Sequence, residues 1–379
     1  MEKPEIYLDN AATTRVCAEA ADIAYKVMTD CYGNPSSTHT KGRDAKAYLD
    51  TARAQIAAAL GCSASEVYFT SCGSESDVWA ITRGAESAAR RGRHIISSAV
   101  EHDAVRNTLE ELESRGFEVT YLSPEKDGSV SVDAVKAALR EDTILVTLMM
   151  VNNETGGITD IAAIAKMLKG CGSKALLHTD AVQGFMKVPF SAKKLGADMI
   201  SISGHKIHAP KGIGALYIKT GVKIKPLIRG GAQEGGMRAG TEAMPQIAAF
   251  GKAAEIAFSG MKDNCDTMAS LRALAMSTVC ADIPEAQIIG GGAPHILSVS
   301  LPGWRSEVLM NFLEAEGIYV SRSSACKKGG RSHVLEAMRL PAQVIDGAIR
   351  VSFSRYNTED DVLALCSALK RAHDTLAHR

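Results

Sequence analysis

The sequence lacks several features that would assign it to a special class. Its 43 basic and 43 acidic residues give a formal net charge of zero, so no summed positive field is available for nonspecific binding of nucleic acid or of an anionic membrane. No apolar run is long enough to span a bilayer, and the residues after Met1 do not resemble a signal peptide. We therefore expect a cytoplasmic protein without a membrane partner and without direct nucleic-acid contacts.

Closely spaced cysteine pairs are also missing. The nine cysteines are scattered from Cys17 to Cys366, which favours neither a disulfide framework nor a metal site. Internal repeats and low-complexity segments are absent as well. What is present is ordinary globular composition, with 46% hydrophobic residues, in a chain of 379 residues. That length exceeds what a single hydrophobic core usually supports, so we expect a large domain with a smaller companion.

Short apolar runs alternate with alanine-rich helical stretches over the first two thirds of the chain. The runs are Val67–Thr70, His94–Ser97, Glu118–Leu122, Thr143–Val151, Ala175–Asp180 and Met199–Ser203. Runs that are apolar along their whole length indicate strands buried on both faces, as in a mainly parallel α/β sheet. Ligands of such a sheet bind beyond the carboxyl ends of its strands.

After about Thr241 the pattern changes to long helices followed by a different group of strands. Strand-like segments at 295–301, 318–321 and 349–353 surround a helix at 307–316, and a final helix begins at Glu359. We interpret this region as a smaller α+β domain. The expected division is a large domain of residues 15–255 and a small domain made of residues 1–14 and 256–379.

Three polar segments each follow a predicted strand. Gly73 and Ser74 lie between a strand and a helix, where free backbone N–H groups can bind an anion such as phosphate, although an ordinary helix cap has the same pattern. Asp180 ends a strand and could hold a protonated ring nitrogen or cap the next element. Lys206 follows the strand that ends at Ser203 and could bind an aldehyde covalently, although most lysines are solvated.

A phosphate cradle, a strand-end carboxylate and a strand-end lysine, in this order along an α/β chain, are what a pyridoxal 5′-phosphate site requires. His205 and His208 could suggest a metal, but no second ligand cluster accompanies them, so no metal is expected.

With these motifs the sequence resembles the cysteine desulfurases of the NifS and IscS type, which belong to the class V aminotransferase family, over essentially its whole length. The motifs that carry the resemblance are 7–14 (YLDNAATT), 32–37 (YGNPSS), Glu101-His102, 152–156 (NNETG), the Asp180 and Lys206 segments, 233–241 (QEGGMRAGT), 323–326 (SSAC) and Ile349-Arg350.

This resemblance implies a type I aminotransferase fold and a homodimer that acts on L-cysteine. It implies that Lys206 carries the cofactor, that Asp180 binds the ring nitrogen, that Gln183 binds the ring hydroxyl and that His102 stacks on the ring. The remaining roles implied are phosphate binding by Gly73, Ser74, Ser203, His205 and the neighbouring subunit's Thr241, and substrate binding by Asn34, Asn153 and Arg350.

Cys326 is the residue that the resemblance implies as the sulfur acceptor. A thiolate is a suitable nucleophile toward the substrate's sulfur, and Lys327 and Lys328 next to Cys326 favour the thiolate. A loop cysteine without a role is the alternative. The expected products are L-alanine and a persulfide on Cys326, which would serve a protein acceptor in iron–sulfur cluster assembly or tRNA thiolation.

The sequence departs from the family pattern at a few positions. Cys72 stands where the family commonly has glycine or alanine, Ser74 where it has threonine, and Asp77 and Ala243 where it has asparagine. The segment after Cys326 is about two residues shorter than in long-loop members. Alternative functions are a class V aminotransferase or a selenocysteine lyase, which would not need Cys326, and a scaffold without catalytic activity.

Overall fold

The computed structural model describes residues 5–322 and 330–376 of the chain. Its main sheet has seven strands in the order β2-β8-β7-β6-β5-β3-β4. The strands are β2 (Val67–Thr70), β3 (His94–Ser98), β4 (Glu118–Leu122), β5 (Thr143–Thr147), β6 (Leu176–Asp180), β7 (Met199–Ser203) and β8 (Gly214–Ile218). Only β8 runs antiparallel to its two neighbours within this sheet. The predicted mainly parallel α/β sheet is therefore confirmed.

Two details of the sheet differ from the sequence-based expectation. The strand β8 was not predicted, and β5 ends at Thr147 instead of continuing to Val151. Beyond Thr147 the N–H groups of Leu148 and Met150 still donate to the carbonyls of His178 and Asp180 in β6, whereas the N–H of Met149 donates to the Glu101 carboxylate at 3.1 Å instead of to a neighbouring strand. Val151 takes part only in an isolated bridge with Ile158.

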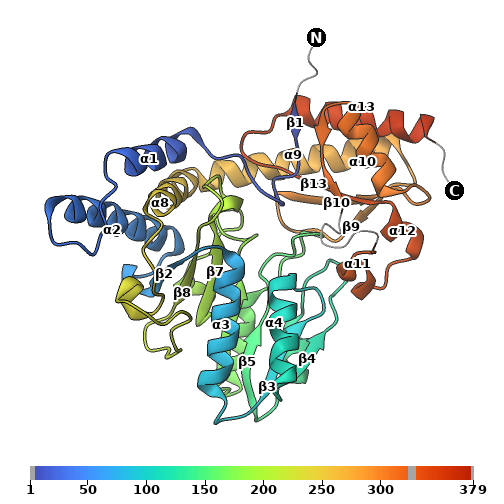
Figure 1. The fold of residues 1–379 in the computed structure, drawn as a ribbon. Helices are drawn as coiled ribbons and strands as arrows, with labels where there is room; N and C mark the ends of the chain where they lie inside the picture. The colour runs from blue at the N-terminus through green and yellow to red at the C-terminus, as the bar shows by residue number, and fades with distance from the viewer. Residues whose placement is uncertain (1–4, 323–329, 377–379) are drawn as a thin grey trace.

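Helices cover both faces of this sheet (Figure 1). Successive strand residues point to opposite faces, so Ile95 and Leu145 pack on one side while Ile96 and Val146 pack on the other. The first face is covered by α3 (Gly73–Ala88) and α4 (Asp103–Ser114). The helices of the opposite side are α1 (Ala18–Thr29), α2 (Thr40–Leu60), α5 (Val132–Ala138), α6 (Ile161–Gly170), α7 (Ala192–Leu195) and α8 (Met244–Ser259).

A second group of elements forms its own hydrophobic core, at the upper right of Figure 1. Its sheet has the order β12-β13-β10-β9, and β1 (Ile6–Tyr7) pairs separately with β11 (Ile318–Tyr319). The four strands are β9 (Gln287–Ile289), β10 (Ile296–Ser300), β12 (Ser321–Arg322) and β13 (Ala348–Ser352). The helices are α9 (Met261–Asp282), α10 (Ser306–Ala315), α11 (His333–Ala337), α12 (Ala342–Asp346) and α13 (Glu359–Thr375).

The N-terminal segment joins this second group although it is far from it in the sequence. Ile6 and Leu8 are buried in the second core, and the backbone N–H of Ser352 donates to the carbonyl of Leu8 at 2.7 Å. The residues just after Leu8 then cross to the cofactor-side loops, where Thr14 pairs with the carbonyl of His205. This crossing brings residues 9–12 between the two groups of elements.

No helix within residues 5–322 and 330–376 is long and apolar enough to cross a membrane.

Candidate active site

A cavity of about 430 Å³ opens at the carboxyl ends of the central strands of the main sheet. Asp180 is the last residue of β6 and Ser203 the last residue of β7, and both line this cavity. Parallel strands place their carboxyl ends at one edge, so side chains distant in sequence meet there. The cavity also receives Arg350 from β13 of the second group.

One end of the cavity is formed by the start of α3. Gly73 is its first residue and Ser74 its second, so the helix presents free N–H groups and the positive end of its dipole. A Cβ atom on Gly73 would lie 2.7 Å from Val182 Cγ2 and 3.3 Å from Ser203 Cβ, so this close approach needs glycine. Among the described residues the buried Ser203 Oγ has no hydrogen-bond partner, which leaves it available to an anion.

His205 adds a neutral donor or acceptor beside this end. Its Nδ1 lies 3.2 Å from Thr13 Oγ1, and burial together with the nearby Lys206 charge lowers the pKa of its ring to about 3. A neutral imidazole here can donate to a phosphate oxygen from its other nitrogen. Helix N-terminus, orphaned hydroxyl and imidazole together fit the phosphate of pyridoxal 5′-phosphate.

Asp180 is a buried carboxylate deeper in the cavity. The backbone N–H of Val182 donates to Asp180 Oδ1 at 2.8 Å. Burial raises the pKa of Asp180, while the Val182 hydrogen bond and the nearby Lys206 charge oppose this rise. A cationic ring nitrogen would compensate a buried carboxylate of this kind.

His102 lies across the cavity as the N-cap of α4, and its Nδ1 accepts a hydrogen bond from the Ala104 N–H at 3.1 Å. That bond fixes the imidazole orientation, and the side chain remains exposed. An exposed ring held in one orientation on the cavity wall is suited to stacking on a planar cofactor.

Lys206 projects into the cavity from the short 3-10 helix that follows β7. Its Nζ donates to the carbonyl oxygens of Ala11 at 2.6 Å and Ala12 at 2.8 Å. Burial and the Arg350 charge lower the pKa of this amine to about 8. A lysine with a depressed pKa can supply the neutral amine that attacks an aldehyde.

Arg350 is held at the far side of the cavity by contacts from two other segments. Its Nη2 donates to Asp9 Oδ1 at 2.8 Å and its Nη1 donates to the carbonyl of Asn153 at 2.9 Å. Arg350 is only 3% exposed, and its Nε is buried with no partner in the part of the chain that the structure describes. The guanidinium thus keeps a donor available for the carboxylate of a small substrate.

Gln183 lines the cavity with its amide already engaged. Its Nε2 donates to the carbonyl of Ala11 at 2.8 Å, and its Oε1 lies 3.2 Å from His295 Nε2. The structure thus gathers most of the predicted site residues around one cavity. They are Gly73, Ser74, His102, Asn153, Asp180, Gln183, Ser203, His205, Lys206 and Arg350.

Two predicted residues are described but are not among those that line the cavity. Asn34 lies in an exposed loop between α1 and α2, and Thr241 is exposed on the segment before α8. Cys326 lies outside the described residues. Their roles remain predictions.

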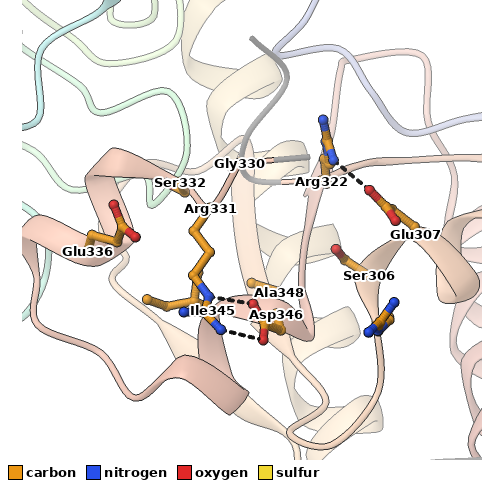
Figure 2. Close-up of a pocket in the computed structure, with 11 residues that line it drawn as sticks. Ser306, Glu307, Arg322, Gly330, Arg331, Ser332, Glu336, Ile345, Asp346 and Ala348 are labelled. Atoms are coloured by element: carbon orange, nitrogen blue, oxygen red, sulfur yellow. Dashed lines mark hydrogen bonds and ion pairs between the residues drawn. The ribbon is translucent and has the colours of Figure 1, made fainter. Parts of the chain in front are cut away.

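The residues that flank positions 323–329 are anchored by ion pairs around a second cavity of about 600 Å³ (Figure 2). Arg322 Nη1 donates to Glu307 at 2.8 Å, and Arg331 contacts Asp346 through two hydrogen bonds of 2.7 and 2.9 Å. The positive charge of Arg331, five positions after Cys326 in the sequence, is therefore compensated by the Asp346 carboxylate.

The adjacent residues contact the main cavity. Ser332 donates to the buried Glu154 carboxylate, and His333 Nε2 lies 3.1 Å from the carbonyl of Glu101. Burial raises the pKa of Glu154 to about 7. The chain that leads out of the Cys326 segment is thereby attached to the cofactor side of the molecule.

Sequence reasoning assigned no role to Asp9, Ala11, Ala12 and Glu154, which orient Lys206, Arg350 and Ser332. A signal was present, because these residues belong to the segments 7–14 and 152–156 that carry the family resemblance. Two of the contacts are made by backbone carbonyls, so side-chain chemistry alone could not have revealed them.

The comparisons with known proteins agree with this site. The family model described as aminotransferase class-V matches residues 6–365. The chain is 43% identical over 366 residues to a cysteine desulfurase IscS of Methanosarcina thermophila, covering 95% of this chain and 90% of that protein. It is 39% identical to a cysteine desulfurase IscS of Dictyoglomus turgidum, covering 99% of this chain and 96% of that protein.

Solved structures show the same similarity. A NifS-like protein superposes with a TM-score of 0.93 at 38% identity, covering 98% of this chain and all of that one. SspA in complex with cysteine superposes with a TM-score of 0.79 at 32% identity, covering 94% and 100%.

Fold and site together define a pyridoxal-phosphate enzyme of the type I aminotransferase fold. The chain belongs to the class V aminotransferase family, and within it to the cysteine desulfurases of the NifS and IscS type.

Proposed function

We propose that this enzyme converts L-cysteine to L-alanine and retains the removed sulfur as a persulfide on Cys326. The observation that carries the proposal is the cavity in which Lys206, Asp180 and Arg350 meet. Its relatives are named cysteine desulfurases at 43% and 39% identity, and one similar structure contains cysteine. An aminotransferase, a selenocysteine lyase and an inactive scaffold are less well supported by these relatives.

The cofactor would be held by the residues already described. Gly73, Ser74, Ser203 and His205 would bind its phosphate, and His102 would stack on its ring. Asp180 would pair with the ring nitrogen, and the side chain of Gln183 would contact the ring hydroxyl. When bound, pyridoxal phosphate supplies an electron sink for the bonds around the substrate's α-carbon.

The chain itself supplies the substrate contacts and the proton transfer. The Arg350 guanidinium would bind the substrate carboxylate, with the Asn153 side chain beside it, and Asn34 would complete the substrate contacts. Lys206, whose amine has a pKa of about 8, would take a proton from the substrate's α-carbon and return it to the product. Near neutral pH such an amine exists in both protonation states, as a base that is also an acid must.

Cys326 would complete the reaction as a nucleophile. Its thiolate attacks the sulfur of the substrate, an S–S bond forms, and the substrate's C–S bond breaks. In total, L-cysteine and the Cys326 thiol give L-alanine and the Cys326 persulfide, so the atoms balance without an external oxidant.

We also propose that the active form is a homodimer. Thr241 is exposed and lies outside the cavity of its own chain, and a second copy could place its Thr241 at the phosphate end of the cavity. The segment that carries Thr241 is attached to the start of α3, because Arg238 Nε donates a hydrogen bond to Glu75 at 2.8 Å. The N–H of Ser71 donates to the same carboxylate.

The remaining parts of the proposal rest on sequence and packing. The division into residues 15–255 and residues 1–14 with 256–379 agrees with the burial of Ile6 and Leu8 in the second core. A protein acceptor in iron–sulfur cluster assembly or tRNA thiolation would receive the sulfur, and the cytoplasm is the proposed compartment.

The test is to incubate the purified protein with L-cysteine and dithiothreitol and to measure alanine and sulfide in the same sample. Equal amounts of both are expected. Cys326→Ser should keep the bound cofactor's absorption but release almost no sulfide, while Cys280→Ser, at an exposed cysteine of α9, should behave like the wild type. Unchanged sulfide release by Cys326→Ser would refute the role of Cys326 and make Cys72 the next thiol to test.

A further inference from the structure

A second buried carboxyl lines the cofactor cavity and has no part in the proposed mechanism. Asp77 lies in the second turn of α3, is 2% exposed and borders the same cavity as Asp180. Its Oδ1 is buried and has no hydrogen-bond partner within residues 5–322 and 330–376. The family commonly has asparagine at the position of Asp77.

The groups that face Asp77 come from every element packed around it. Asp180 and His178 face it from β6, Glu101 from the segment after β3, and Cys72 from the start of α3. The acidic groups among them oppose a charge on Asp77, and a contact with the Ser201 side chain of β7 only partly compensates.

His178 does not supply a positive charge. Its Nε2 lies 3.6 Å from Asp77 Oδ1, within ion-pair distance. However, burial lowers the pKa of His178 to about 3, and its two ring nitrogens are engaged with the hydroxyls of Thr147 and Ser201 at 2.8 and 2.9 Å. Its imidazole is therefore neutral, and the contact with Asp77 is not an ion pair.

Two neighbouring carboxyls in a buried site cannot both be ionised at low cost. Burial and the charge of Asp180 raise the pKa of Asp77 well above its ordinary value. Asp180, by contrast, accepts a hydrogen bond from the Val182 N–H and has the compensating charge of Lys206 nearby. The proton of the pair is therefore favoured on Asp77 and the negative charge on Asp180.

We propose that Asp77 is a positioning residue that is a neutral carboxylic acid in the cofactor cavity near pH 7, which keeps the negative charge of the pair on Asp180, and that it ionises within the pH range in which the bound cofactor titrates. The inference rests on the proposed function only in that Asp180 pairs with the ring nitrogen. At alkaline pH, ionisation of Asp77 adds a second negative charge, which stabilises the cationic form of the bound cofactor. Asparagine at this position would be neutral too, but it could not titrate.

The protonation state can be measured in the cofactor-free protein by infrared spectroscopy. The wild type minus Asp77→Asn difference at pH 7 should contain the carbonyl band of a protonated carboxylic acid, and this band should disappear as the pH is raised. Glu101→Gln is the matched control. Burial raises the pKa of Glu101 to about 8, so this variant should lose a carboxylic-acid band that differs from the band of Asp77. Absence of the Asp77 component at pH 7 would overturn the proposal.

The effect on the cofactor is measured in the loaded protein by titrating its visible absorption. The wild type should titrate at a pH higher than Asp77→Asn by at least about half a unit, a roughly threefold change in proton affinity. Coincident titrations would show that the ring does not sense Asp77 and would overturn the proposal. Should the amide variant fail to fold, Asp77→Ser replaces it, since it also removes the carboxyl.

These readouts are separate from the proposed desulfurase activity. The infrared band in the cofactor-free protein does not depend on turnover of L-cysteine. A protein that shows the band but forms no alanine would contradict the proposed function alone.

Discussion

The Nζ of Lys206 lies 2.6 Å from the carbonyl oxygen of Ala11, to which it donates a hydrogen bond. The bond joins two segments that are 195 positions apart in the sequence. It is one reason why the N-terminal segment belongs to the active site although its first strand pairs in the other core. The carbonyl orients the amine without removing its ability to react, since burial and Arg350 keep its pKa at about 8.

Lys206 is predicted to be the residue that binds the cofactor covalently. At pH 7 about one tenth of an amine with this pKa is neutral, which is enough to react with an aldehyde. Reduction of the loaded protein with borohydride should therefore attach the cofactor to Lys206, as peptide mapping will show. Lys206→Ala should lose turnover completely. A label on Lys211, which is exposed, would contradict the assignment.

Gly73 is predicted to be required for cofactor affinity because its Cβ position is already occupied by Val182. Overpacking of this kind costs about 1 to 3 kcal/mol. Gly73→Ala should thus weaken cofactor binding by about ten- to hundredfold, measured by titrating the cofactor-free protein. Gly170→Ala is the control, since nothing lies within 4 Å of its Cβ position, and it should bind the cofactor as the wild type does.

The difference between what the sequence predicted and what it missed has a physical basis. The strand ends at Asp180 and Ser203 follow buried apolar runs, so the local pattern was sufficient to predict that they end strands, while their roles at the site came from the family resemblance. The strand β8 is also an apolar run, which the sequence-based prediction overlooked, whereas the contacts of Ala11 are made by its backbone carbonyl, for which the sequence has no local signal. Asp77 was recognised as unusual, but only the structure showed that its carboxyl is buried beside Asp180.

Glu154 is predicted to make stability depend on pH. Its pKa is about 7 in the folded protein and about 4.3 in an unfolded chain, so the folded state retains a proton that the unfolded state loses. Its contribution is fully present below about pH 4 and is lost as the pH rises through about 7, at up to about 1.4 kcal/mol per pH unit. Glu154→Gln should flatten the fall of the unfolding midpoint between pH 5 and 7, measured by urea denaturation. An equally steep fall in this variant would contradict the shifted pKa.

The last prediction concerns the charges beside Cys326. Arg331 is neutralised by Asp346, so Lys327 and Lys328 are left as the basic pair next to the thiol in the sequence. An acceptor protein with an acidic rim would be attracted by this pair, and its association should weaken as salt is added. Lys327→Gln combined with Lys328→Gln should slow sulfur transfer to the acceptor at low salt, while release to dithiothreitol stays unchanged.

The matched control is Lys193→Gln with Lys194→Gln, an exposed lysine pair on α7, which should leave both reactions unchanged. Transfer should be compared at low and high salt, because screening acts on steering but much less on a charge next to the thiol. If the Lys327 and Lys328 variant slows both reactions equally at all salt concentrations, the lysines act by favouring the Cys326 thiolate and not by attracting the acceptor. If instead only sulfur transfer to the acceptor slows, and only at low salt, the lysine charges attract the acceptor protein to the segment that carries the Cys326 persulfide.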